Sequence, residues 1–169
     1  MPEGDRPPGA GARGKSGLSA ADREEQYVTV RGLRLHVVTC GRGSPLLLIN
    51  GIGANLDMWA PFVEHLDGRR VILFDAPGTG KSGTPGLPLS MYQLAGVVAD
   101  LLDAVGEDAV DVLGFSYGSA LAQQFARRHP ARVRRLVLAA ATYGIGAVPG
   151  RASFLLASPS RYYSERLFR

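Results

Sequence analysis

The 169-residue chain lacks the features that several classes of protein require. It has one cysteine, Cys40, so it offers neither an internal disulfide nor a cluster of thiolates for a metal ion. No apolar run approaches the roughly 20 residues that cross a bilayer, and the opening residues MPEGDRPPGAGARG contain no apolar signal segment. We therefore expect no metal, no cofactor, no integral membrane association and a cytoplasmic location.

A large excess of charge is also absent. The formal net charge is +4, and residues 1–24 hold four acidic and four basic side chains, which cancel. The excess comes from arginines that follow residue 126, such as Arg127 and Arg128, which precede Pro130 at a predicted helix end. Cations at that end complement the helix dipole. We interpret these arginines as a solvated face and expect no nucleic-acid partner.

The hydrophobic pattern divides the chain into a tail and a core. Residues 1–24 are rich in Gly, Pro, Ala and charge and lack periodicity, which predicts a flexible tail. The core is expected over residues 25–144. Its first runs, YVTV and LRLHVVTC, alternate on either side of Arg31 and Gly32 and predict a hairpin.

The rest of the core alternates strands with helices. PLLLIN at 45–50 and VILFD at 71–75 are nearly all apolar, which is typical of strands covered on both faces. MWAPFVEHL predicts a short helix, and Ser90 can cap a helix that runs to Val105. AVDVLGF, YGSALAQQFARR and RRLVLAAAT then predict strand, helix and strand. This order predicts an α/β fold with a mostly parallel sheet behind an antiparallel hairpin.

The strongest motif for chemistry is Gly114-Phe115-Ser116-Tyr117-Gly118, which ends a predicted strand and opens a predicted helix. A sharp strand-to-helix turn forces its middle residue into a strained conformation, and glycines two positions away let the chains pass closely. The pattern alone occurs by chance, but its context favours a nucleophile elbow. We predict that Ser116 is an exposed catalytic nucleophile.

A second glycine-rich segment, Asn50-Gly51-Ile52-Gly53, follows a predicted buried strand. Acyl transfer to a serine needs donors for the developing oxyanion. We expect the backbone N–H groups of Ile52 and Tyr117 to supply them, with Gly51 and Gly53 shaping the turn.

Two segments resemble the phosphate loop GxxxxGK[ST]. Residues 9–16 match it, but no buried strand precedes them. Residues 75–82 follow an apolar strand but begin with Asp75, whose carboxylate would oppose a polyphosphate, and Pro85 breaks the helix that must follow. We expect Asp75 to shape a turn and expect no nucleotide binding.

The runs LLLINGIGANLDMW, FDAPGTGKSGTP, VDVLGFSYGSALAQQFA and RRLVLAAAT, with VPG and ASPSRYY after them, together resemble the α/β-hydrolase superfamily. Over about residues 27–169 the chain is similar to the intracellular medium-chain polyhydroxyalkanoate depolymerases. The resemblance implies a serine esterase with an ester or polyester substrate, association with polymer inclusions, and a lid that begins near residue 145. The elbow departs from the family's usual Ser-Trp-Gly-Gly, because Tyr117 and Ser119 replace the Trp and the second Gly.

The sequence after Ser116 contains no acid followed by a histidine, which a catalytic triad of this fold requires. In this fold the order is Ser, then Asp or Glu, then His. After Ser116 the chain offers only His129 and Glu165, in reverse. His129 lies at the far end of the predicted helix, roughly 20 Å from Ser116 at about 1.5 Å per residue, whereas His36 and His65 precede the nucleophile.

We therefore interpret the chain as the N-terminal part of a longer hydrolase, incomplete at its C-terminal end and inactive alone. Its last strand would then be an open edge, which favours aggregation. Another α/β-hydrolase activity, as a peptidase or a cofactor-free haloperoxidase, and a non-catalytic binding protein remain alternatives.

Overall fold

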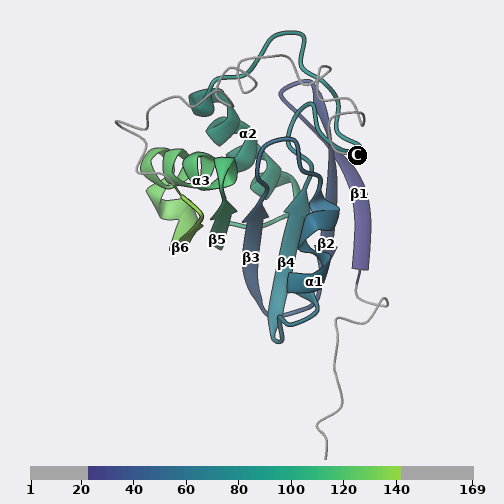
Figure 1. Ribbon diagram of the computed structural model, residues 1–169, viewed down its shortest axis with the longest axis vertical. Helices are drawn as coiled ribbons and strands as arrows, with labels where there is room; N and C mark the ends of the chain where they lie inside the picture. The colour runs from purple at the N-terminus through teal and green to yellow at the C-terminus, as the bar shows by residue number, and fades with distance from the viewer. Residues whose placement is uncertain (1–22, 142–169) are drawn as a thin grey trace, which may run out of the picture.

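The computed structural model describes residues 23–141, which form a six-stranded mixed sheet with helices on both faces (Figure 1). The strands are β1 (Arg23–Val30), β2 (Leu33–Cys40), β3 (Ser44–Ile49), β4 (Arg69–Phe74), β5 (Val110–Phe115) and β6 (Val133–Ala139). Their order is β1-β2-β4-β3-β5-β6. β2 runs antiparallel to β1 and β4, and all other neighbours are parallel. The α/β class, the mostly parallel sheet and the N-terminal hairpin are confirmed.

The boundaries of the described part bear on two expectations about the ends of the chain. β1 begins at Arg23, so Arg23 and Glu24 lie in a strand although the sequence pattern assigned them to the tail. The rest of that tail and the lid expected from residue 145 lie outside the described residues. Within residues 23–141, no helix has the length and apolar character needed to cross a bilayer.

The helices follow the predicted pattern. α2 (Met91–Ala104) begins after Ser90, whose hydroxyl accepts a hydrogen bond from the Gln93 amide while the Gln93 side chain accepts one from the Ser90 amide. α3 (Tyr117–Arg128) follows β5, and the 3-10 helix η3 (Pro130–Arg132) leads into β6. The short helix between β3 and β4 begins earlier than expected, as the 3-10 helix η2 (Leu56–Trp59), and continues as α1 (Ala60–Val63).

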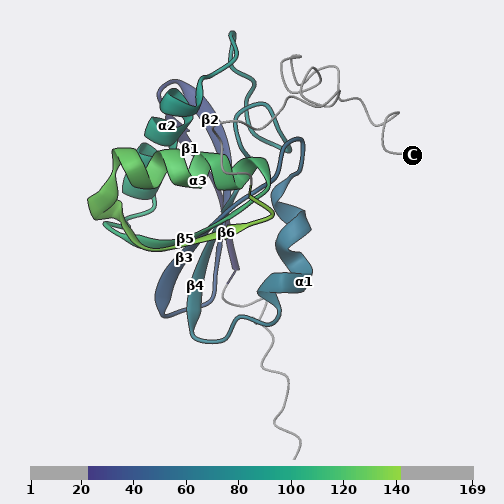
Figure 2. The ribbon, with the colours of Figure 1, turned by 60° about the vertical axis from the view of Figure 1, so that its left-hand side comes forward.

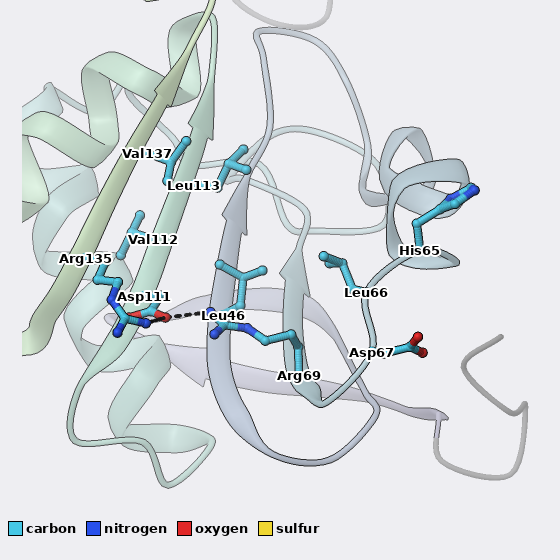
Figure 3. A pocket seen from close by; sticks show the side chains of 10 residues that line it. All are labelled: Leu46, His65, Leu66, Asp67, Arg69, Asp111, Val112, Leu113, Arg135 and Val137. Atoms are coloured by element: carbon cyan, nitrogen blue, oxygen red, sulfur yellow. Dashed lines mark hydrogen bonds and ion pairs between the residues drawn. The ribbon is translucent and has the colours of Figure 1, made fainter. Parts of the chain in front are cut away.

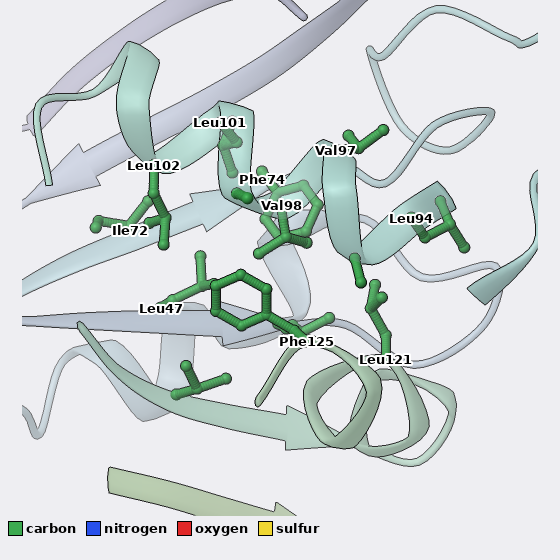
Figure 4. Close-up of a cluster of buried hydrophobic side chains, with 14 of the residues drawn as sticks. Leu47, Ile72, Phe74, Leu94, Val97, Val98, Leu101, Leu102, Leu121 and Phe125 are labelled. Atoms are coloured by element: carbon green, nitrogen blue, oxygen red, sulfur yellow. The ribbon is translucent and has the colours of Figure 1, made fainter. Parts of the chain in front are cut away.

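Two apolar clusters fill the two faces of the sheet. α2 and α3 cover one face, and η2 with α1 covers the other (Figure 2). Neighbouring strand residues divide between them: Leu47 and Ile72 pack under α2 and α3 (Figure 4), whereas Leu48 and Leu73 pack under η2 and α1. This division explains why the inner strands read as unbroken apolar runs.

β6 differs from the inner strands. Within residues 23–141 it pairs only with β5 and forms one edge of the sheet. Leu136, Val137 and Leu138 are 38%, 52% and 38% exposed. The run RRLVLAAAT predicts a strand correctly, but its apolar side chains are only partly covered by the described part of the chain.

Candidate active site

Ser116 lies at the turn from β5 to α3, at the carboxyl end of the parallel strands. Its backbone has φ 53° and ψ −117°, an unusual conformation for a residue with a β-carbon. Such a conformation costs about 1–3 kcal/mol and persists where neighbouring contacts hold it. Ser116 is exposed. The sharp turn expected from the sequence is therefore present.

The two flanking glycines are required by close backbone contacts. A β-carbon on Gly114 would lie 2.7 Å from Cα of Ser119. One on Gly118 would collide with the backbone carbonyls of Ile49 and Asn50, where β3 ends. The backbone at Gly114 therefore contacts the backbone of α3 directly, and the backbone at Gly118 contacts that of the end of β3 and the loop after it.

The glycine-rich loop after β3 lies beside the elbow. A β-carbon on Gly51 would lie 3.7 Å from Cβ of Ser116. The amide of Ala54 donates to the Gly51 carbonyl at 3.3 Å and closes a turn, in which Gly53 has φ +70° and Ile52 is 40% exposed. The structure thus brings Gly51 of this loop beside the serine.

Tyr117 is the first residue of α3, so its amide has no acceptor within the helix. Its side chain packs against the core beneath α2 and α3, and burial raises the pKa of its phenol. The Tyr117 amide thus lies next to Ser116 without an acceptor inside the helix, and the Tyr117 side chain packs against the core.

Asn50 begins the loop that the sequence analysis named, but its side chain has a structural role that the sequence did not predict. It is 5% exposed, and its amide nitrogen donates to the carbonyl oxygens of Phe74 at 3.3 Å and Ala54 at 3.5 Å. The Trp59 indole N–H donates to its side-chain oxygen at 2.5 Å. Asn50 therefore ties the loop after β3 to β4 and η2. A polar residue at the end of an apolar strand was the available signal.

The three histidines of the chain lie away from the elbow. His129 follows the last residue of α3, and at about 1.5 Å per residue a 12-residue helix is roughly 18 Å long. Burial lowers the pKa of its imidazole, and Arg128 and Arg132 lower it further. His65 is exposed beyond α1, where Nδ1 contacts the Pro61 carbonyl at 2.8 Å.

His36 is 2% exposed and lies on β2, three strands and about 14 Å from β5 at about 4.8 Å per strand. Its Nδ1 is 2.8 Å from Asp75 Oδ2 and its Nε2 is 2.8 Å from Glu25 Oε1. Both ring nitrogens are therefore engaged by carboxylates. The sequence did not predict this buried arrangement, because it depends on contacts between β1, β2 and the loop after β4, which are separate segments of the chain.

Asp75 organises the segment that resembles a phosphate loop. Its carboxylate accepts hydrogen bonds from the amides of Leu56 at 2.8 Å and Lys81 at 2.9 Å. A β-carbon on Gly80 would collide with this carboxylate. The Lys81 ammonium pairs with Glu25 at 2.8 Å. The amide and the lysine that would bind a phosphate are therefore occupied by acidic side chains.

One hollow lies near the amino ends of the parallel strands (Figure 3). It is lined by Leu46, Arg69 and Asp111, among others, and the Arg69 guanidinium donates to the Asp111 carboxylate at 2.6 Å. This hollow therefore belongs to the end of the sheet opposite to Ser116. In the part of the chain that the structure describes, no three His, Cys, Asp or Glu side chains gather closely enough to hold a metal ion.

Comparisons with known proteins agree with this geometry. A model of the alpha/beta hydrolase fold family matches residues 44–159. A poly(3-hydroxyalkanoate) depolymerase of Ectopseudomonas oleovorans is 49% identical over 122 residues, which cover 70% of this chain and 43% of that protein. The chain thus spans less than half of this relative's length.

Solved structures give the same result. Cfl2 from Burkholderia cenocepacia matches with a TM-score of 0.69 at 27% identity, covering 80% of this chain and 50% of that one. A membrane phospholipase A described as a bacterial virulence factor matches with a TM-score of 0.65 at 34% identity, covering 75% of this chain and 40% of that one. The chain belongs to the alpha/beta hydrolase fold family.

Proposed function

We propose that this chain is part of a serine carboxylic-ester hydrolase in which Ser116 is the nucleophile. The observation that carries the proposal is the strained, exposed turn at Ser116 between β5 and α3, beside the loop of residues 50–54. Exposure leaves the hydroxyl accessible to a substrate carbonyl. The neighbouring loop offers a backbone donor on one side, and the start of α3 offers another.

In the proposed reaction, Ser116 Oγ attacks the ester carbonyl carbon while a general base takes the hydroxyl proton. The amides of Ile52 and Tyr117 donate to the oxyanion. The alcohol leaves with that proton, and water then releases the acid from the acyl-serine. The geometry of His36, His65 and His129 supports a base outside the 169 residues, so we propose that this chain alone is inactive as an esterase.

We propose a polyester of 3-hydroxyalkanoates as the substrate class, on the basis of the name of the 49% identical relative and of its share of this chain. A peptidase or a haloperoxidase would use the same elbow, and a non-catalytic binding protein would keep the fold. Activity measurements of the full-length protein on hydroxyalkanoate polyesters, small esters and peptides with an N-terminal proline distinguish these candidate functions.

The inactivity of the isolated chain is tested with p-nitrophenyl octanoate. We expect the chain to hydrolyse the ester no more than about 10³–10⁴-fold faster than water does, which is the residual catalysis that remains when triad members are removed. We expect the full-length protein to turn the ester over, and Ser116→Ala to abolish that turnover. Ordinary enzymatic turnover by the 169-residue chain, abolished by Ser116→Ala, would contradict the proposed inactivity. Turnover by the full-length Ser116→Ala variant would contradict the nucleophile.

A further inference from the structure

Ser119 lies one helical turn into α3 from the candidate nucleophile, at a position where this sequence departs from the elbow of the family it resembles. Its side chain is 0% exposed. The hydroxyl lies 2.6 Å from the Gly114 carbonyl oxygen and 2.9 Å from the Ala139 carbonyl oxygen. One hydroxyl proton thus faces the carbonyls of two neighbouring strands, β5 and β6.

These contacts close a ring around Ser116. The Ser116 amide donates to the Ala139 carbonyl at 2.9 Å, and the Ser119 amide donates to the Ser116 carbonyl at 2.9 Å. The Ala139 carbonyl therefore receives hydrogen bonds from Ser116 and from the Ser119 hydroxyl. The Ser116 amide is thus bound to a carbonyl that the Ser119 hydroxyl also contacts, and the Ser116 carbonyl is bound to the Ser119 amide.

We infer that Ser119 is a positioning residue that holds Ser116 in its strained turn and links that turn to the end of β6. A strained residue relaxes unless its neighbours fix it, and a buried hydrogen bond contributes about a factor of ten in an equilibrium. Without the hydroxyl, the buried Gly114 carbonyl and the part-buried Ala139 carbonyl lose the proton they share, and the acceptor of the Ser116 amide is no longer fixed. The catalytic meaning of this inference rests on the proposed function, whereas the structural link does not.

The test compares Ser119→Ala with Ser82→Ala in the full 169-residue chain. Ser82 is a matched control because its hydroxyl also joins two backbone groups, donating to the Asp75 carbonyl at 2.7 Å and accepting from the His36 amide at 2.9 Å. Hydrogen exchange of the Ser116 amide is measured by NMR and divided by that of the Val112 amide on β5. We expect Ser119→Ala to raise this ratio about tenfold and Ser82→Ala to leave it unchanged.

A second measurement, made in the full-length protein that supplies the general base, follows phosphonylation of Ser116 by a fluorophosphonate probe. We expect Ser119→Ala to lower the rate at saturating probe about tenfold and to leave the half-saturating concentration unchanged. Ser119→Cys keeps the shape of the side chain with a weaker hydrogen-bond donor. We therefore expect its exchange ratio and its phosphonylation rate to lie between those of the wild type and of Ser119→Ala. If Ser119→Ala does not fold, the comparison of Ser119→Cys with the wild type decides the test.

Equal exchange ratios in wild type, Ser119→Ala and Ser119→Cys would overturn the positioning role. An altered exchange ratio in the 169-residue chain, together with a full-length protein whose Ser116 never reacts with the probe, supports the structural link and counts against the nucleophile. The two failures are therefore distinguishable.

Discussion

At the scale of single residues, the conformation of Ser116 determines which side chains its neighbours can carry. The turn brings α3 so close to the end of β3 that Gly118 leaves no room for a β-carbon. The same closeness brings Gly51 beside the serine. The glycines of the motif are thus explained by backbone contacts and not by flexibility.

The Gly118→Ala substitution tests this closeness. Its β-carbon would lie 2.5 Å from the Asn50 carbonyl oxygen, so the backbone must move and we expect a loss of about 1–3 kcal/mol in the free energy of unfolding. Chemical denaturation measures it. Gly86→Ala is the control, because Gly86 is exposed with open space at its β-carbon position, and its change should stay within about 0.5 kcal/mol. Equal changes in the two variants would contradict the close contact.

Single residues also mark the limit of sequence reasoning at this site. The motif around Ser116 predicted the turn because glycine, serine and strand-to-helix context carry local information. Asn50 and Ser119 could not be assigned partners in the same way, since their hydrogen bonds reach Phe74 and Ala139, which lie 24 and 20 residues away in the sequence.

At the scale of secondary-structure elements, ionic contacts fasten the N-terminal hairpin to the loop after β4. Glu25 on β1 accepts hydrogen bonds from Lys81 and faces His36 on β2, each at 2.8 Å. β1 pairs only with β2 within the described sheet. Glu25 therefore adds a tertiary contact to a strand whose only partner in the described sheet is β2.

This contact predicts a dependence of stability on acid pH. Hydrogen bonds from Lys81 and then His36 lower the pKa of the Glu25 carboxyl from 4.5 to about 2. Because the folded-state pKa is depressed, the stabilisation is present above about pH 4.5 and is lost as the pH falls towards about 2. Glu25→Gln should lower stability at neutral pH and flatten this part of the pH profile, measured by denaturant unfolding at several pH values.

Glu24→Gln is the control for that profile, because Glu24 is exposed on the same strand. We expect its pH profile to follow that of the wild type. A Glu25→Gln profile that also parallels the wild type would show that this carboxylate does not couple the hairpin to the loop.

The elements themselves were largely predictable. α3 has the expected bounds, and Ser90 caps α2 because a serine followed by Gln93 satisfies the first free amides of a helix. The order of the strands was not predictable from these local signals. β4 lies between β2 and β3 because of pairings that no local periodicity encodes.

At the scale of the whole molecule, the sheet of residues 23–141 ends at β6, an edge strand with the exposed apolar run Leu136, Val137 and Leu138. β6 has unpaired backbone groups on its outer side within the described chain, and Val137 is 52% exposed. Apolar edge strands favour pairing between molecules. We therefore expect the isolated chain to associate as its concentration rises.

Sedimentation velocity over a range of concentrations tests this expectation. The average sedimentation coefficient of the wild type should rise with concentration, and Val137→Lys should reduce the rise because a charge on an edge strand opposes pairing. Leu87→Lys is the control, since Leu87 is 78% exposed but lies in the loop before α2. A wild-type chain that stays monomeric at every concentration and melts cooperatively would contradict the open edge.

The sequence alone determined the α/β class, the hairpin, the glycine-bounded turn at Ser116 and the resemblance to hydrolases, because these depend on local periodicity, turn chemistry and short motifs. Only the tertiary structure decided that Gly51 lies beside Ser116, that His36 is buried between two carboxylates, and that Ser119 joins β5 to β6. Those relations arise from the packing of segments far apart in the chain, and neither composition nor spacing records which distant groups meet.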